Sequence, residues 1–258
     1  MLRFRSLGSG SKGNATLVEA TSGGATTRLL VDCGFGLRQL DLRLARAGLA
    51  ADDIDAIFIT HEHGDHIGCV HAVSLRSRIP VWMSEGTWLA TGARDFEGRL
   101  QFAQDGAIID LGGLAIEPFT VPHDAREPLQ LTCGDGARRL GILTDLGRET
   151  PHVLGRLAGV DALLLEFNHD SDLLAASPYP PFLKQRVGGS HGHLSNAAAA
   201  AIARAVNHAG LRHVVAAHLS EQNNRPELVR QALAEALGRL AQDVITADAA
   251  EGFAWLDV

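Results

Sequence analysis

Short apolar runs recur along the whole chain, and segments whose apolar residues have helical spacing separate many of them. Runs of this kind, bounded by Gly, Pro, Asn or Asp, are typical of β-strands. The segments predicted as strands are 2–7, 15–20, 28–31, 54–60, 81–83, 162–167, 214–217, 244–247 and 253–258, with strand-like segments around 108–121 and 129–143.

Helical spacing is clear in 37–48, where Leu40 and Leu44 share one face and Gly48 ends the pattern. The stretch 168–192 is rich in Pro, Gly and Ser, and we predict a long functional loop there. Strands that alternate with helices indicate an α/β protein. No linker, charge block or repeat interrupts the pattern, so we expect one domain over 1–258. Further helices are predicted at 68–77, at 151–157, from Ser195 or Asn196 to Gly210, and from Pro226 onward.

The composition allows a packed core, because 46% of the residues are hydrophobic and 21% are charged. A formal net charge of -7 argues against coating nucleic acid by bulk charge, although a local basic groove is compatible with it. Cys33, Cys69 and Cys133 form no Cys-x-x-Cys pair, which favours a reducing compartment. No run has the apolar length of a membrane span or a secretion signal, so we predict a cytoplasmic protein without membrane association.

The densest chemistry lies in residues 60–66, Thr-His-Glu-His-Gly-Asp-His, directly after a predicted buried strand. Three imidazoles and two carboxylates fall within six residues there. Imidazole is a good ligand for zinc, iron and manganese, and carboxylate is the harder partner. Packing alone cannot satisfy such a cluster at a strand end, whereas a single histidine is usually a core or surface residue. The pattern therefore predicts a metal site.

Residues 60–66 resemble the signature motif of the metallo-β-lactamase superfamily. The resemblance implies a four-layer αβ/βα sandwich of two mixed β-sheets flanked by helices. It also implies a centre that binds two divalent metal ions, zinc or manganese, with iron as a further option. Downstream residues at predicted strand ends complete the implied ligand set, with Asp145 as the bridging carboxylate. The implied ligands are His61, His63, Asp65, His66, His123, Asp145 and His218.

Two such metals lower the pKa of a water molecule to give a hydroxide nucleophile and stabilise the charge that develops on oxygen. By the resemblance, Asp65 also orients the nucleophile, which makes it a catalytic candidate. Asp32, at the end of a predicted strand, is a candidate to orient a ligand histidine.

A longer resemblance narrows the group within the superfamily. Its segments resemble YycJ/WalJ-type proteins, which are related to ribonuclease Z and to phosphonate-pathway phosphodiesterases. This resemblance implies a phosphodiesterase, most simply a nuclease that acts 5′ to 3′ on DNA, with nucleic acid as its substrate partner. The segments are 4–14, 30–34, 166–170, 178–186, 192–196 and 217–224.

The remaining polar residues of these segments are candidates for substrate contacts and proton transfer. Residues 8–13 match Gly-x-Gly-x-x-Gly but lead into a strand, so they are no dinucleotide fingerprint. Cleavage of a phosphodiester needs a proton for the departing oxygen, and His193 or His169 is the candidate general acid. Each is equally compatible with an ordinary hydrogen-bonded loop histidine. The candidate substrate contacts are Ser11, Lys12, Asn14, Asn168, Lys184, Arg186 and Ser195, for which a tight turn or a solvated loop is the competing interpretation.

Several alternatives stay open at this point. A glyoxalase II-like thioesterase has the same ligand set, and a small-molecule phosphodiesterase is compatible with the acidic chain. A non-catalytic metal-binding module fits less well, because the ligand set is complete. Asp145 stands where an antibiotic-degrading lactamase with two zinc ions usually has Cys, and His63 stands where flavodiiron proteins usually have a carboxylate. The sequence does not decide whether the substrate is DNA or RNA, or whether the protein is a monomer or a dimer.

Overall fold

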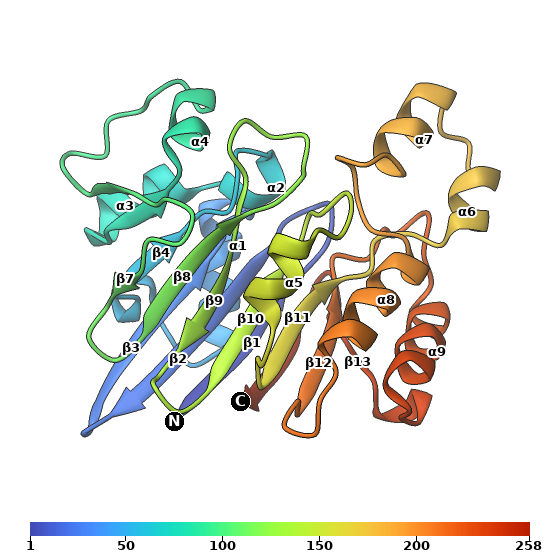
Figure 1. Ribbon diagram of the computed structural model, residues 1–258. Helices are drawn as coiled ribbons and strands as arrows, with labels where there is room; N and C mark the ends of the chain where they lie inside the picture. The colour runs from blue at the N-terminus through green and yellow to red at the C-terminus, as the bar shows by residue number, and fades with distance from the viewer.

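The computed structural model describes residues 1–258 and contains two seven-stranded mixed β-sheets that pack face to face (Figure 1). The first sheet has the order β14 (Phe253–Asp257), β1 (Leu2–Gly8), β2 (Ala15–Ser22), β3 (Ala25–Val31), β4 (Ala56–Phe58), β5 (Val81–Met83), β6 (Leu100–Phe102). The second has the order β13 (Ile245–Thr246), β12 (His213–Ala217), β11 (Ala162–Glu166), β10 (Arg139–Leu143), β9 (Leu129–Gly134), β8 (Ala115–Thr120), β7 (Ile109–Asp110).

Helices cover the outer face of each sheet. On the side of the first sheet lie α1 (Leu37–Arg46), α2 (Gly64–Ile67), α3 (Val70–Ser77) and α4 (Glu85–Ala90). On the side of the second lie α5 (Pro151–Leu157), α6 (Ser171–Ala176), α7 (Pro181–Val187), α8 (Asn196–Val206) and α9 (Pro226–Leu237). This is the four-layer αβ/βα arrangement, so the predicted fold is confirmed.

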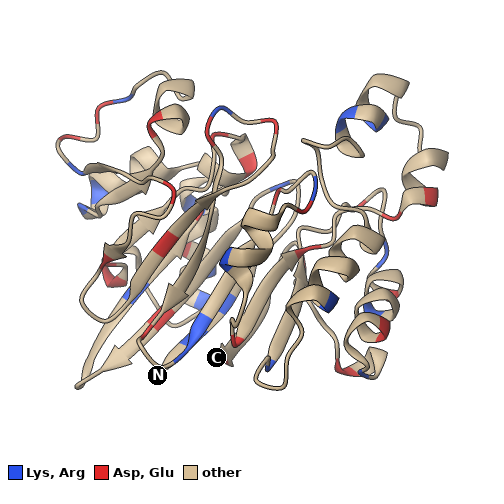
Figure 2. Ribbon diagram, in the orientation of Figure 1, with Lys and Arg blue, Asp and Glu red and all other residues tan.

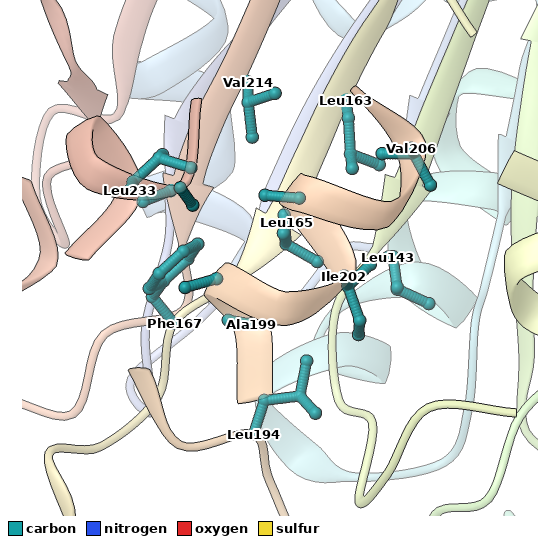
Figure 3. Packing of buried hydrophobic residues seen from close by; sticks show 14 of the residues in the cluster. Leu143, Leu163, Leu165, Phe167, Leu194, Ala199, Ile202, Val206, Val214 and Leu233 are labelled. Atoms are coloured by element: carbon teal, nitrogen blue, oxygen red, sulfur yellow. The ribbon is translucent and has the colours of Figure 1, made fainter. Parts of the chain in front are cut away.

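Three buried apolar clusters correspond to the three interfaces between these four layers. Successive residues of a strand point to opposite faces of its sheet, and β11 shows the result. Leu163 and Leu165 pack against the residues of α8, among them Ile202, in the cluster of Figure 3. Leu164, between them in sequence, joins the cluster between the two sheets. A strand buried on both faces reads as a continuous apolar run, which is what the sequence has there.

Parallel strands in the two sheets bring functional loops to one end of the sandwich. β3, β4, β5 and β6 are parallel to one another, as are β10, β11, β12 and β13. The carboxyl ends of parallel strands meet at one edge of a sheet, which is where α/β proteins usually place their ligands. In Figure 1 the loops after β3, β4 and β10 lie toward the top of the molecule.

The predicted loop at 168–192 is wrong in part, because it contains the short helices α6 and α7. The predicted helix at 68–77 is also corrected. The chain becomes helical at Gly64, inside the histidine motif, and breaks at Gly68 before α3 begins. Gly68 has a φ of 27°, and a Cβ atom there would lie 2.3 Å from the Cys33 carbonyl oxygen, so close contact with the preceding loop forces the break.

Other boundaries shift by a few residues. α8 ends at Val206 instead of Gly210, and α4 and β6 were not predicted, because each is too short to show a period. None of the helices combines the length and the apolar character that crossing a membrane requires.

Candidate metal centre and cleft

Strands of both sheets end at the candidate site. Asp32 follows β3, residues 61–66 follow β4, and Asp145 comes two residues after β10. Glu166 is the last residue of β11, and His218 directly follows β12. The two sheets thus supply polar side chains from facing edges to one point at the end of the sandwich.

His61, His63 and His123 form one group of ring nitrogens. His61 Nε2 lies 3.1 Å from His63 Nδ1, which in turn lies 3.3 Å from His123 Nε2. One ligand atom of each histidine lies within 4.8 Å of the others. Burial is the largest effect on His61 and His123 and lowers the pKa of both, with the pKa of His61 well below its usual value. The lowered pKa values of His61 and His123 favour neutral imidazoles with unshared electron pairs, as in a metal site.

Asp65, His66 and His218 form a second group within the same distance limit, and Asp145 lies between the two groups. One Asp145 carboxylate oxygen, Oδ2, lies 3.0 Å from His66 Nε2. The other, Oδ1, lies 3.2 Å from His218 Nδ1 and 3.9 Å from His123 Nε2. Asp145 therefore reaches both groups, which is the position that a bridging carboxylate needs.

The donor set fits divalent cations. Asp145 Oδ2 and His218 Nε2 are buried and make no hydrogen bond, although Asp145 Oδ2 lies close to His66 Nε2. Such an arrangement costs free energy unless a cation or water satisfies these atoms. Burial tends to lower the pKa of His66, but the charges on Asp145 and Asp32 outweigh it and raise that pKa well above its usual value. The negative potential that favours a proton there favours a metal cation equally. Nitrogen and carboxylate ligands together suit zinc, manganese or iron.

Asp32 lies behind His66, one of the candidate ligand histidines. Its Oδ2 lies 2.7 Å from His66 Nδ1, and its Oδ1 accepts hydrogen bonds from the Thr60 backbone N–H at 2.9 Å and hydroxyl at 3.0 Å. With Nδ1 engaged, the Nε2 atom of His66 faces Asp145. A carboxylate behind a ligand imidazole fixes its ring orientation and tautomer.

Glu166 contacts the ring nitrogens of two other histidines, as Asp32 contacts that of His66. The sequence alone assigned no role to Glu166. Its Oε1 lies 2.7 Å from His193 Nδ1 and 3.2 Å from His218 Nδ1. Its Oε2 accepts the backbone N–H groups of Leu146 and Leu194, each at 3.0 Å. Burial acts to raise the pKa of Glu166, but the two histidines outweigh it and lower that pKa to about 2. The one signal in the sequence is a carboxylate at the end of an apolar strand.

A cleft of about 320 Å³ opens over the centre and includes His63, Asp65, Asp145, His193 and His218 in its wall. The Nε2 atom of His193 has no hydrogen-bond partner in the protein. Burial acts to lower the pKa of His193, but the Glu166 carboxylate outweighs burial and raises that pKa above its usual value. A larger cavity of about 500 Å³, beside the first turn of α9, contains none of the clustered histidines.

His169, the other candidate general acid, is buried beside α7 and is not part of the cleft wall. Its Nδ1 atom has no hydrogen-bond partner, and Gly188 packs next to its Nε2 atom.

The structure brings Ser11 and Arg186 to the cleft wall, and it does not bring the two lysines there. The Lys12 side chain is 79% exposed and pairs with Glu221 at 2.7 Å. Lys184 Nζ donates a hydrogen bond to the Ala175 carbonyl, so it joins α7 to α6.

The other three predicted substrate contacts hold local structure. Asn14 Nδ2 lies 3.3 Å from the Asp65 carbonyl oxygen and 3.2 Å from His66 Nε2. Asn168 Nδ2 donates to the His218 carbonyl at 3.2 Å. The Ser195 hydroxyl accepts the Ala198 N–H and caps α8. Their roles toward a substrate stay predictions.

Asp124 is a further residue of the cleft that the sequence did not single out. Its Oδ2 accepts a hydrogen bond from Arg186 Nε at 2.5 Å, and its Oδ1 lies 3.4 Å from His123 Nε2. Burial acts to raise the pKa of Asp124, but the hydrogen bond from Arg186 outweighs burial and holds that pKa below its usual value. Its position next to His123 in sequence is the only signal that marks it.

Comparison with known proteins agrees with this geometry. The model of the β-lactamase superfamily domain matches residues 27–219, which include all of the clustered histidines and carboxylates described above. The chain belongs to the metallo-β-lactamase superfamily. Within the superfamily it is 32% identical to exodeoxyribonuclease YycJ of Bacillus anthracis, over 92% of this chain and 89% of that protein.

Two further proteins are similar to it. Ribonuclease Z of Streptomyces coelicolor is 32% identical over 77% of this chain and 79% of that protein. The crystal structure of the metallo-β-lactamase fold protein YhfI from Bacillus subtilis has a TM-score of 0.76, with 18% identity and all of both chains covered. The second likeness concerns the fold alone.

Proposed function

We propose that this protein is a metal-dependent phosphodiesterase that degrades DNA from the 5′ end. The observation that carries the proposal is the two facing groups of candidate ligand atoms, joined by Asp145, beneath a cleft whose wall includes His193, which Glu166 contacts from behind. The named relatives, an exodeoxyribonuclease and a ribonuclease Z, support phosphodiester chemistry. We propose zinc or manganese, held by His61, His63 and His123 on one side and Asp65, His66 and His218 on the other.

Bound metal ions would supply a water-derived nucleophile and an electrophile for the phosphoryl oxygens. Among the protein groups, Asp65 is placed to orient the nucleophile, because it lies in the cleft wall next to the ligands. Arg186 is placed to pair with a phosphate oxygen, since only its Nε is engaged, with Asp124.

His193 is the better placed of the two candidate general acids. It lines the cleft, and its Nδ1 atom is held by Glu166 at 2.7 Å, which leaves Nε2 to donate a proton to the departing oxygen. Glu166 acts on it as a positioning residue.

The test is the hydrolysis of 5′-phosphorylated single-stranded and double-stranded DNA by the protein loaded with zinc or manganese. We expect stepwise release of nucleotides from the 5′ end and loss of that activity in Asp145→Asn. Turnover of a thioester without turnover of DNA, RNA or a simple aryl phosphodiester, at confirmed metal content, would refute the proposal and favour a glyoxalase II-like thioesterase.

A further inference from the structure

Helix α7 projects from the end of the sandwich and has no fully buried residue to hold it against the rest of the protein. None of the residues of Pro181–Val187 is buried. Figure 1 shows α6 and α7 standing beyond α8, away from the sheets. Since packing of an apolar face supplies most helix stability in proteins, the position of α7 calls for another explanation.

One side of α7 forms part of the catalytic cleft. Leu183, Arg186 and Val187 lie in the wall of the cleft together with Asp65 and His193. Any substrate that occupies the cleft therefore contacts α7. Gly192 holds the end of the α7 segment in place, because a Cβ atom there would lie 2.1 Å from the Arg186 carbonyl oxygen.

Next to the cleft, α7 presents an aromatic ring to solvent. Phe182 is 71% exposed, more than any other large hydrophobic residue of the protein. Phe182 and Arg186 are four residues apart, so they lie on the same face of the helix, one turn from each other. The helix contains Lys184 and Arg186 but no acidic residue, and in Figure 2 it is marked by blue without red.

We propose that α7 binds the single-stranded end of a nucleic acid, with Phe182 stacked on a base that lies just outside the cleft. This deepens the proposed function and rests on it. In this arrangement Arg186 pairs with the phosphate next to the cleft, and the ring one turn away takes the adjoining base. An exposed aromatic beside a cation is the combination that single-stranded nucleic acid requires, since unpaired bases offer a π-face and the backbone offers charge. A duplex hides those faces, and a small phosphodiester has no base to reach the ring.

The charges of α7 also indicate that its ligand is a nucleic acid. The protein is acidic overall, yet the charges of α7 are both positive. At Arg186 only the Nε atom donates to a protein group, so Nη1 and Nη2 are available for phosphate oxygens. Nucleic acid is the polyanion that pairs cation and aromatic contacts in this way.

The test compares Phe182→Ala with the wild-type metal-loaded protein on two substrates. For a 5′-phosphorylated single-stranded oligonucleotide, we expect kcat/KM to fall about 5- to 150-fold, from loss of one base–aromatic stack. For bis(p-nitrophenyl) phosphate, which has no adjoining nucleotide and so no base for Phe182 to stack on, we expect no change. Phe182→Trp should restore cleavage of DNA. Phe102→Ala is the matched control, because Phe102 is an exposed phenylalanine of β6 that lies outside the cleft wall.

Three outcomes would overturn the proposal. They are an unchanged kcat/KM for DNA in Phe182→Ala, an equal loss on both substrates, and a loss that accompanies conversion of a dimer to a monomer in native mass measurement. The last would make Phe182 part of a subunit interface. If the wild-type protein cleaves no phosphodiester, the proposed function fails separately. Fluorescence anisotropy of a labelled single strand, with wild type against Phe182→Ala, then still decides whether α7 binds it.

Discussion

Asp32, Asp145 and His218 adopt left-handed backbone conformations, with φ values of 63°, 52° and 53°, each at the end of a strand. For a residue other than glycine this costs about 1–3 kcal/mol, and it persists only where the surroundings enforce it. Here the turn points a carboxylate or an imidazole back toward the space between the sheets. The strained backbone at these three residues therefore sets the direction of their side chains.

Asp32→Asn tests the orientation of His66 without altering the backbone. Asn, like Asp, adopts the left-handed region more readily than most other residues that are not glycine. We expect metal affinity to fall about 10- to 100-fold, since the anionic partner behind the ligand imidazole is lost. Competition with a chromogenic chelator measures this directly. Asp41→Asn, which removes an exposed carboxylate of α1 paired with Arg76, is the control and should leave the affinity unchanged. Equal affinity in both variants would contradict the role given to Asp32.

His193→Ala should lower kcat by about 10²–10⁴ if this histidine donates the proton to the departing oxygen. His169→Ala, which changes a histidine outside the cleft wall, should lower kcat far less. A substrate whose leaving group is p-nitrophenolate needs little protonation, so its turnover should survive His193→Ala. The reverse ranking of the two variants would assign the proton transfer to His169.

At the scale of elements, the loop between β3 and α1 packs directly on the metal-binding motif. A Cβ atom on Gly34 would lie 1.7 Å from the Asp65 carbonyl oxygen and 2.7 Å from the Asn14 backbone nitrogen. Asn14 also donates its N–H to that carbonyl at 2.8 Å. Three segments therefore meet at a point where only a hydrogen atom fits.

Gly34→Ala should displace the first turn of α2, which carries Asp65. We expect a loss of activity of at least about 10²-fold and a loss of stability of about 1–3 kcal/mol from overpacking. Gly36→Ala is the matched control, because a Cβ atom on Gly36 meets nothing within 4 Å. Activity assays and thermal unfolding of both variants measure the effects. Similar values for the two alanine variants would show that the contact at Gly34 is dispensable.

The elements that the sequence predicted are those with a clear apolar period. The run 162–167 predicted β11, and the face of Leu40 and Leu44 predicted α1, because both bury their apolar residues. α7 has seven residues, which is too short to show a helical period, and none of them is buried. Pro181 at its first turn was the clearest available signal.

The candidate site was likewise predictable only in part. Residues 61–66 are adjacent in sequence and carry a recognisable pattern. Glu166 and Asp124 are recognisable only through their contacts with His193, His218 and Arg186, which are distant in sequence. Single carboxylates at strand or loop ends are too common to be selected without those contacts.

At the scale of the whole molecule, the candidate ligands join the two sheets. His61, His63 and His66 come from the first sheet, and His123, Asp145 and His218 come from the second. The apolar cluster between the sheets holds them at the distances described above. Ions bound by both sets would therefore add to the free energy that keeps the sheets together.

Removal of the metal ions by a chelator should lower the melting temperature. Metal at 100 times its dissociation constant adds about 2.7 kcal/mol to the folded state. For a chain of this size that corresponds to a shift of roughly 5–10 °C. Differential scanning calorimetry with and without added zinc or manganese measures it, and Asp145→Asn should show a smaller shift. An unchanged melting temperature after confirmed removal of metal would mean that the centre does not join the sheets.

The spacing of the ligands along the chain has a consequence for biosynthesis. The histidines of residues 61–66 leave the ribosome first, and His218 follows about 8–30 s later at roughly 5–20 residues per second. During that interval the nascent chain has one half of its centre and no facing half. A stalled or truncated product therefore lacks the second set of ligands. Catalytic competence therefore requires synthesis at least through residue 218, so a product that ends before His218 would be inactive.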